Sequence, residues 1–292
     1  MNAAPMRKIL AALALLLAAA LPALAQDAAA LHARNQSLEA AFAASPFGRP
    51  LVLQSQERDD VLQGDVYARI GAPYADVQKN LQGTAHWCEI LILHLNVKGC
   101  HASANGLALL VGRKFEQPES DATRLDFGYR AVASSADYLQ VRLDAADGPM
   151  GTSDYRIVLE AVPLDARTSF LHMSYAYRYG TAARIAMSGY LATLGRGKVG
   201  FTVTGQGNDG KPNYIDGIRG VLERNTMRYY LAIDVYLASL AQPSGERNER
   251  RLAAWFDVTE RYARQLHEME RDDYLAMKRH EVAGATGAAS GP

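Results

Sequence analysis

Two cysteines and three histidines lie within one short segment, HWCEILILHLNVKGCH, which runs from His86 to His101. Cys88 and Cys100 are the only cysteines among the 292 residues. Residues of these types could hold a metal ion, form a reactive thiol centre or close a disulfide loop. The choice depends on the compartment, because disulfides persist in oxidising media and thiols in reducing ones.

The N-terminus has the three-part pattern of a secretory signal. Arg7 and Lys8 precede an apolar stretch over residues 9–21, and a proline and the small-residue pattern Ala-Leu-Ala follow. We expect cleavage after Ala25, because the apolar core is short for a membrane span. The mature chain should then keep no stable membrane anchor and be periplasmic or secreted.

An oxidising compartment favours a disulfide between Cys88 and Cys100, which enclose eleven residues. Closing a loop of that size contributes about 3 kcal/mol in the chain-entropy model. The first alternative is a metal site, but the spacing matches no compact zinc pattern, and on a helix His86, Cys88 and His94 point in different directions. The second alternative is a pair of buried free thiols.

Charge and motifs restrict the partners. Lysine plus arginine equals aspartate plus glutamate at 31 each, and no basic cluster predicts a nucleic-acid partner. The segment GRGKVG at 195–200 lacks the spacing of a phosphate loop, so it is either an ordinary connection or a gate over a cavity. No Gly-x-Ser-x-Gly elbow is present. We therefore expect no cofactor and no metal, and we identify no catalytic residue.

The elements that would position these residues follow from hydrophobic periodicity. A spacing of three or four predicts helices, whereas alternation predicts strands separated by Gly, Pro, Asp or Ser. The predicted order is a helix at 27–45, a strand at 65–70, a helix at 73–94, antiparallel strands over 107–179, a short helix at 181–195, a long helix at 215–242 and a final helix at 246–282.

This order, carried by GDVYARIGAPYADV, RIVLEAVPL, TSFLHMSYAYRYG and GVLERNTMRYYLAIDVYL, resembles the START-like superfamily (SRPBCC, polyketide cyclase, Bet v 1-like). The resemblance implies an α+β helix-grip fold, in which a curved antiparallel sheet wraps around a long C-terminal amphipathic helix and leaves a cavity for apolar molecules. Extra helices depart from the simple pattern. The predicted organisation is a signal peptide at 1–25, an N-terminal helical segment at 26–59, a START-like domain at 60–242, a C-terminal helix at 243–282 and a disordered tail at 283–292.

Polar residues interrupt the apolar stripe of the long helix. In one interpretation Arg219 and Glu223 form a pair four residues apart on a solvated face. In the other, one or two polar groups between 223 and 228 point into the cavity and orient a ligand. Tyrosines on the apolar face of the last strand are candidates for the cavity wall. The candidate ligand-binding residues are Tyr129, Tyr175, Tyr177, Glu223, Asn225 and Tyr229.

These features predict an exported protein that binds an apolar or amphipathic, lipid-like small molecule between the sheet and the long helix. One alternative is an enzyme on the same fold, such as a cyclase or hydrolase-like protein, which a strongly shifted pKa inside the cavity would favour. The other is an envelope module that binds a protein partner through the C-terminal helix. An exposed stripe at Trp255, Tyr262 and Leu266 would favour that module.

Overall fold

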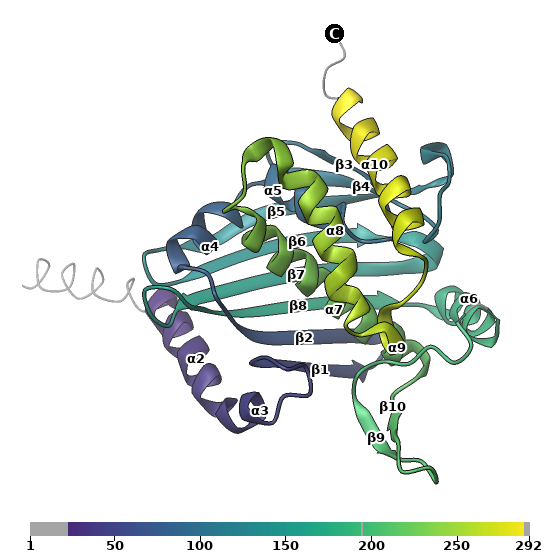
Figure 1. Ribbon diagram of the computed structural model, residues 1–292, viewed down its shortest axis with the longest axis horizontal. Helices are drawn as coiled ribbons and strands as arrows, with labels where there is room; N and C mark the ends of the chain where they lie inside the picture. Colours follow the sequence, from purple (N-terminus) through teal and green to yellow (C-terminus); the bar gives the residue numbers. More distant parts are fainter. Residues whose placement is uncertain (1–22, 194, 289–292) are drawn as a thin grey trace, which may run out of the picture.

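The protein is built on one eight-stranded antiparallel sheet (Figure 1). The computed structural model describes residues 23–193 and 195–288. In spatial order the strands are β1 (Leu51–Arg58), β2 (Val61–Ile70), β8 (Ser169–Tyr179), β7 (Thr152–Pro163), β6 (Leu139–Asp147), β5 (Thr123–Ser134), β4 (Gly106–Val111) and β3 (Val97–Ala102). Strand β2 pairs with β8, and β1 extends the sheet beyond β2 as an edge strand.

The strand alternation predicted for the last strand is present in β8. Met173, Tyr175, Tyr177 and Tyr179 are all buried, whereas Arg178 between them is exposed. Because successive side chains of a strand point to opposite faces, these four residues share the inner face of the sheet.

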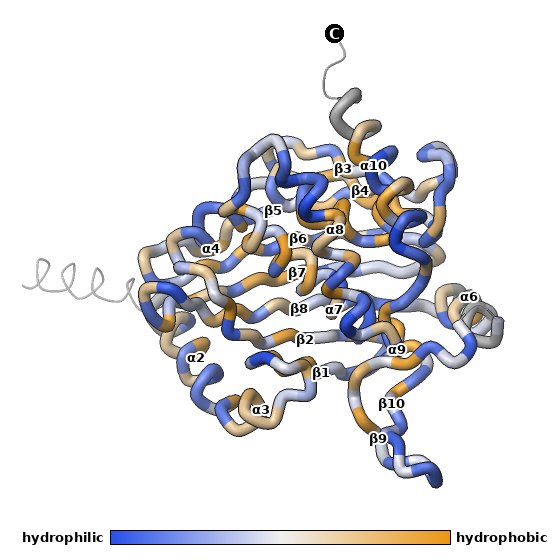
Figure 2. Tube along the Cα trace, viewed as in Figure 1, coloured by the Kyte–Doolittle hydropathy of each residue, from blue (hydrophilic) through white to orange (hydrophobic). Residues whose placement is uncertain are grey.

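Helix α7 (Gly217–Ser239) lies across that inner face and contacts β1 and β2. It approaches β2 closely at Gly64, where a Cβ atom would lie 2.3 Å from the Oγ1 of Thr226. A glycine is therefore required for the helix to pack here. Figure 2 shows hydrophobic segments along the strands, in contrast to the hydrophilic tip of the hairpin that β9 (Val203–Gln206) forms with β10 (Pro212–Tyr214).

Two short helices, α4 (Tyr74–Asn80) and α5 (Thr84–Leu91), replace the continuous helix predicted over 73–94. The prediction was wrong because Gly83 has a φ of 87°, a backbone conformation that an α-helix cannot contain. The chain therefore leaves one helix before Gly83 and begins another after it. The indole of Trp87 then donates a 2.9 Å hydrogen bond to the carbonyl of Leu81 across this break.

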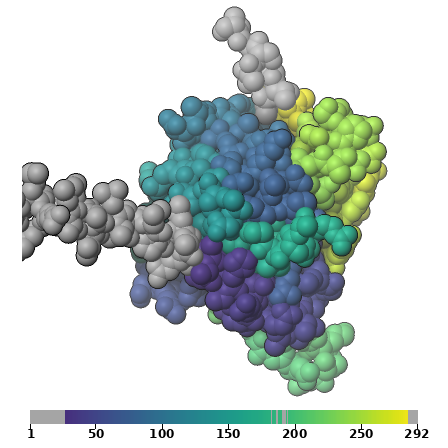
Figure 3. All heavy atoms as spheres, turned by 90° about the vertical axis from the view of Figure 1, so that its left-hand side faces the viewer, coloured from purple at the N-terminus to yellow at the C-terminus, as the bar shows by residue number. Residues whose placement is uncertain are grey.

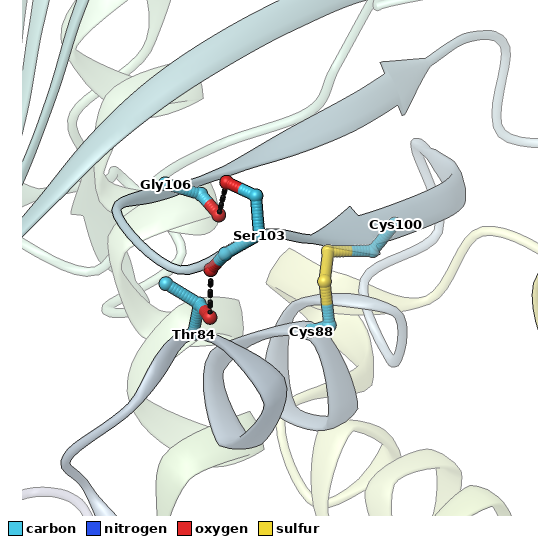
Figure 4. Close-up of a disulfide and its surroundings, with 5 residues drawn as sticks. All are labelled: Thr84, Cys88, Cys100, Ser103 and Gly106. Carbon is cyan, nitrogen blue, oxygen red and sulfur yellow. Dashed lines mark hydrogen bonds between the residues drawn. A yellow bond between two sulfur atoms is a disulfide. The ribbon is translucent and has the colours of Figure 1, made fainter. Parts of the chain in front are cut away.

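The predicted disulfide is confirmed: Cys88 of α5 bonds to Cys100 of β3, with their Cα atoms 5.3 Å apart (Figure 4). Residues 97–102, which we did not predict as a strand, form β3 and bring Cys100 beside the helix. The Thr84 hydroxyl also donates to the carbonyl of Ser103 at 2.6 Å, as Figure 4 shows. Helix α5 is thus fixed to the edge of the sheet at two points.

The final helix predicted over 246–282 is instead three helices, α8 (Arg247–Glu260), α9 (Ala263–Leu266) and α10 (Arg271–Ala288). The chain turns at His267, whose ψ of 128° is extended, because α8 packs on α7 whereas α10 packs on β3. Helix α10 also continues through Ala288, into the tail that was predicted to be disordered. Residues 289–292 lie outside the described part of the chain.

The N-terminal part lies on the outer face. Helices α2 (Ala23–Ser37) and α3 (Glu39–Ala43) replace the predicted helix at 27–45, and Leu31 and Phe42 pack with Phe170 in a second core. Residues 51–58, predicted to belong to a helical segment, form β1 because they pair along the whole length of β2. The predicted signal peptide falls largely outside the described residues.

The segment between β8 and α7 carries α6 (Thr181–Ala192), predicted as a short helix, and a two-stranded hairpin, β9 (Val203–Gln206) with β10 (Pro212–Tyr214). The hairpin projects from the body in Figures 1 and 3. Three short 3-10 turns complete the described part of the chain: η1 (Glu119–Asp121), η2 (Pro149–Gly151) and η3 (Ser244–Glu246). Within the described ranges, no helix has the length and apolar character to cross a membrane.

Candidate functional site

A cavity of about 690 Å³ lies between α7 and strands β4, β5, β7 and β8. It reaches the surface beside η2, because Met150 lines it and is 62% exposed. The lining residues on which the argument depends are His94, Asn96, Lys114, Gln117, Tyr155, Tyr175, Arg224, Asn225, Arg228 and Tyr229. A smaller hollow of about 220 Å³ lies beside the disulfide and includes the ion pair of Glu89 and Arg251 in its lining.

Aromatic side chains form the wall of the cavity nearest β7 and β8. The rings of Tyr175 and Tyr229 meet edge-to-face with centroids 5.1 Å apart, and Tyr155 lies 6.3 Å from Tyr175. Burial raises the pKa of the Tyr175 and Tyr229 hydroxyls, so both stay protonated. With Leu125, Phe127 and Ile157 they give a largely apolar surface.

Helix α7 presents one polar face to this cavity. Val221, Arg224, Asn225, Arg228 and Tyr229 all line it, at spacings of three, one, three and one. Residues with these spacings fall on the same side of an α-helix. The helix therefore places two guanidinium groups opposite the apolar strands.

The polar end of the cavity is a cluster of buried charges. Three residues make up the cationic cluster, Lys114, Arg224 and Arg228, and Glu268 from the turn between α9 and α10 faces it. One oxygen of Glu268, Oε1, accepts from Lys114 Nζ at 2.6 Å and from Arg228 Nη2 at 2.8 Å. The other, Oε2, accepts from Lys198 Nζ at 2.8 Å, so a single carboxylate holds three cations together.

Crowding shifts the protonation equilibria of this cluster. Burial tends to raise the pKa of Glu268, but the charges of Arg228 and Lys114 outweigh it and lower that pKa to about 2. Burial, aided by the nearby charge of Arg228, lowers the pKa of Lys114 to about 8 despite the attraction of Glu268. Positive charge is therefore in excess at this end of the cavity.

His94 lies in the same wall with its ring stacked on Tyr229, the centroids 4.7 Å apart. Its Nδ1 accepts the backbone N–H of Asn96 at 3.1 Å, which places the ring proton on Nε2. Burial, together with the positive charges of Arg228 and Lys278, lowers the pKa of His94 well below its usual range. The neutral ring is thus a hydrogen-bond donor through Nε2, not a base.

The structure divides the six candidate ligand-binding residues into two groups. Tyr175, Asn225 and Tyr229 line the cavity. Tyr129 instead accepts the backbone N–H of Gly83 at 2.7 Å, near the break between α4 and α5. Tyr177 stacks on the ring of Tyr155, the centroids 5.3 Å apart, and is not among the described lining residues.

Glu223, the remaining candidate, is fully buried and turned away from the cavity. Its carboxylate accepts from the hydroxyl of Ser55 at 2.6 Å, from the hydroxyl of Thr202 at 2.6 Å and from the backbone N–H groups of Phe201 and Thr202. The surface-pair interpretation is also wrong, because Glu223 has no exposed surface and Arg219 bonds to Ser55. Glu223 thus joins β1 to residues 201–202, which precede β9.

A second charged cluster, the outer-face triad, lies on the opposite side of the sheet. His172 of β8 bonds to Asp65 at 2.9 Å and to Glu160 at 2.8 Å. Tyr138 donates to Glu160 at 2.5 Å, and Gln63 donates to Asp65. Burial lowers the pKa of His172, but hydrogen bonds to the two carboxylates outweigh it and raise that pKa to about 8.

The sequence interpretation missed several site residues. Lys114 and Gln117 lie in the loop after β4, and Glu268 lies inside what was predicted to be one helix. Arg224 and Arg228 were recognised only as interruptions of the apolar stripe. The signal that could have identified them is their helical spacing with Asn225 and Tyr229, which excludes Glu223 from the same face.

Neither family models nor curated proteins match this sequence. Among solved structures, it is similar to a START superfamily protein from Mycobacterium smegmatis, with 12% identity, 46% of this chain and 92% of that chain covered, and a TM-score of 0.31. It is also similar to norcoclaurine synthase from Thalictrum flavum, with 13% identity, 50% of this chain and 89% of that chain covered, and a TM-score of 0.32. A conserved protein from Geobacillus kaustophilus is similar with 10% identity, 61% of this chain and 95% of that chain covered, and a TM-score of 0.34.

The fold assignment rests on the topology of this chain itself. Strand β2 closes against β8, the remaining strands follow in order to β3, and α7 lies on the inner face above a cavity. An antiparallel sheet that grips a long C-terminal helix in this way is the predicted α+β helix-grip arrangement. The chain therefore has a helix-grip fold, extended by β1 and by the helices after α7.

Proposed function

We propose that this protein binds an amphipathic, lipid-like small molecule in the cavity between the sheet and α7. One observation carries the proposal: a cavity of about 690 Å³ combines a wall of tyrosines and apolar residues with a cluster of polar and charged groups at one end. Ligand pockets commonly have this volume and this division between an apolar body and a few orienting groups.

We also propose that the protein acts outside the cytoplasm. Its N-terminal sequence has the pattern of a cleaved signal, and the bond between Cys88 and Cys100 would persist in an oxidising compartment. These two features support the same compartment independently.

The test is native mass spectrometry of protein purified from the periplasm, followed by organic extraction of whatever it carries. We expect a mature chain beginning at Gln26, with a lipid-like molecule bound in near-stoichiometric amount. A bare chain that also fails to take up any added amphiphile would contradict the proposed function. A chain that retains residues 1–25 would contradict the proposed export.

Catalysis is the second candidate, and Lys114 favours it. A lysine with a pKa of about 8 in a cavity is in part a neutral amine near neutral pH and could attack a carbonyl group. The amine would displace the carbonyl oxygen as water and form an imine. Borohydride treatment in the presence of aldehydes tests this, because a reduced adduct confined to Lys114 would support an enzyme.

The protein-interaction alternative is less well supported by the C-terminal helices. Trp255 and Leu266 are 1% and 2% exposed, and Tyr262 is half-buried with its hydroxyl donating to the carbonyl of Phe47. The stripe that would have indicated a partner surface is thus used to pack α8 and α9 against the body.

A further inference from the structure

The cavity contains buried hydrogen-bond donors that lack acceptors. Within the described part of the chain, neither His94 Nε2 nor Gln117 Nε2 has a hydrogen-bond partner. Asn225 lies close enough to favour the protonated form of His94 slightly, but no hydrogen bond of acceptable geometry joins them. Leaving a buried donor unsatisfied costs about 1–3 kcal/mol, so two such groups in one cavity indicate a missing acceptor.

The orientation of each donor is fixed by its neighbours. Gln117 Oε1 accepts the backbone N–H of Arg113 at 2.7 Å, which leaves its NH₂ group as the unsatisfied end. Asn96 donates to the carbonyl of Gly112 at 2.7 Å and to Nδ1 of His94 through its backbone N–H. This chain of bonds joins His94 to the loop that carries Gln117 and Lys114.

The same end of the cavity also carries several positive charges, which would favour an acidic group as the acceptor. Lys114 and Arg228 share one oxygen of Glu268, and Arg224 lies near enough to Lys114 to disfavour its protonated form. Arg113 and Asp121 also line the cavity and offset one another. The positive charges of Lys114, Arg224 and Arg228 would attract an acidic group of a ligand that enters this end of the cavity.

We infer that the ligand carries an acidic group, a carboxylate or a phosphate, which docks against Lys114, Arg224 and Arg228 and accepts hydrogen bonds from His94 and Gln117. The apolar body of the ligand then lies on the wall formed by Tyr155, Tyr175 and Tyr229. This inference rests on the proposed function and specifies its ligand class. Charge-assisted hydrogen bonds from lysine and arginine suit both acidic groups.

The test compares ligands that differ only at the head group. Delipidated protein is titrated with hexadecanoic acid, hexadecyl phosphate and hexadecanol, and with naphthylacetic acid and naphthylethanol as a second scaffold. We expect at least one acid to bind about tenfold more tightly than its alcohol, as charge-assisted hydrogen bonds predict. Preference between the carboxylate and the phosphate then identifies the head group.

Two variants test the acidic head group separately from the proposed binding of an amphipathic molecule. Lys114→Gln should reduce the affinity for the acid and leave that for the alcohol unchanged, whereas Arg250→Gln, an exposed change on α8, should alter neither. Equal binding of acid and alcohol would overturn the acidic ligand while the proposed function stands. Failure of every compound on both scaffolds would overturn both.

Discussion

The two faces of the sheet each carry a buried charged cluster, and the clusters differ in whether their polar atoms have partners. On the outer face, both ring nitrogens of His172 meet carboxylates, and each carboxylate receives a further donor. At the inner cavity, His94 Nε2 and Gln117 Nε2 are among the buried donor atoms that have no acceptor in the described part of the chain. A complete network stabilises the fold, whereas an incomplete one next to a cavity marks a ligand site.

The largest expected effect concerns Glu268. Its pKa of about 2 lies below the ordinary 4.5, so its stabilising contribution is present above pH 4.5 and is lost as the pH falls towards 2. The shift corresponds to on the order of 3 kcal/mol. Urea unfolding at pH 7, 4 and 3 should show Glu268→Gln less stable at pH 7 and less sensitive to acid than the wild type.

The matched control for that experiment is Glu249→Gln. Glu249 pairs with Arg279 on the surface, where an ion pair contributes about 0.5 kcal/mol. If Glu268→Gln followed the same acid profile as the wild type, the cationic cluster would not depend on this carboxylate.

A smaller effect is expected from the outer-face triad. The pKa of His172 is raised to about 8, so its contribution is complete below pH 6.5 and is lost as the pH rises through 8. This amounts to about 2 kcal/mol. His172→Gln should flatten the unfolding free energy between pH 6.5 and 8 without changing ligand affinity.

Lys114 and Lys278 act in the opposite direction over a higher range. Both have pKa values lowered to about 8, so stability that depends on them rises between pH 8 and 10.5. The effect of His172 is therefore measured as the difference in unfolding free energy between the wild type and His172→Gln below pH 8. A ligand affinity that fell in His172→Gln would remove the distinction between the two faces.

The smallest effect is expected at Gln117. Gln117→Leu removes one hydrogen bond to an acidic ligand, which corresponds to about 1 kcal/mol or roughly fivefold in affinity. Calorimetric titration should detect this loss for the acid and none for the alcohol. Stability should fall by no more than about 1 kcal/mol, because the variant removes the acceptor of the Arg113 N–H as well as an amide NH₂ that has no acceptor. A larger loss of stability in Gln117→Leu would mean that the NH₂ group has a structural role.

The sequence was sufficient for β2, for the strands from β4 to β8 and for the long helix, because alternation and helical spacing are local properties. It also predicted the disulfide, but it missed the edge strands β1 and β3. It was insufficient at Gly83 and at His267, where single backbone angles split predicted helices. It was also insufficient for Glu268, since that residue reaches the cavity only after α8 folds back along α7. Glu223 and Asn225 look alike in the sequence, but about 200° of helical rotation separates them.

Helix α7 contacts the sheet at β1 and β2 through the close approach at Gly64, and the cavity lies over β4, β5 and β7 instead. The space is therefore a wedge, narrow along one edge and wide along the other. Since the narrow edge is fixed by direct contact, a bulkier molecule must press on the walls of the wide edge, which include the loop after β4. That loop also carries Lys114 and Gln117. The size of a ligand's apolar body therefore affects how these two side chains contact its head group.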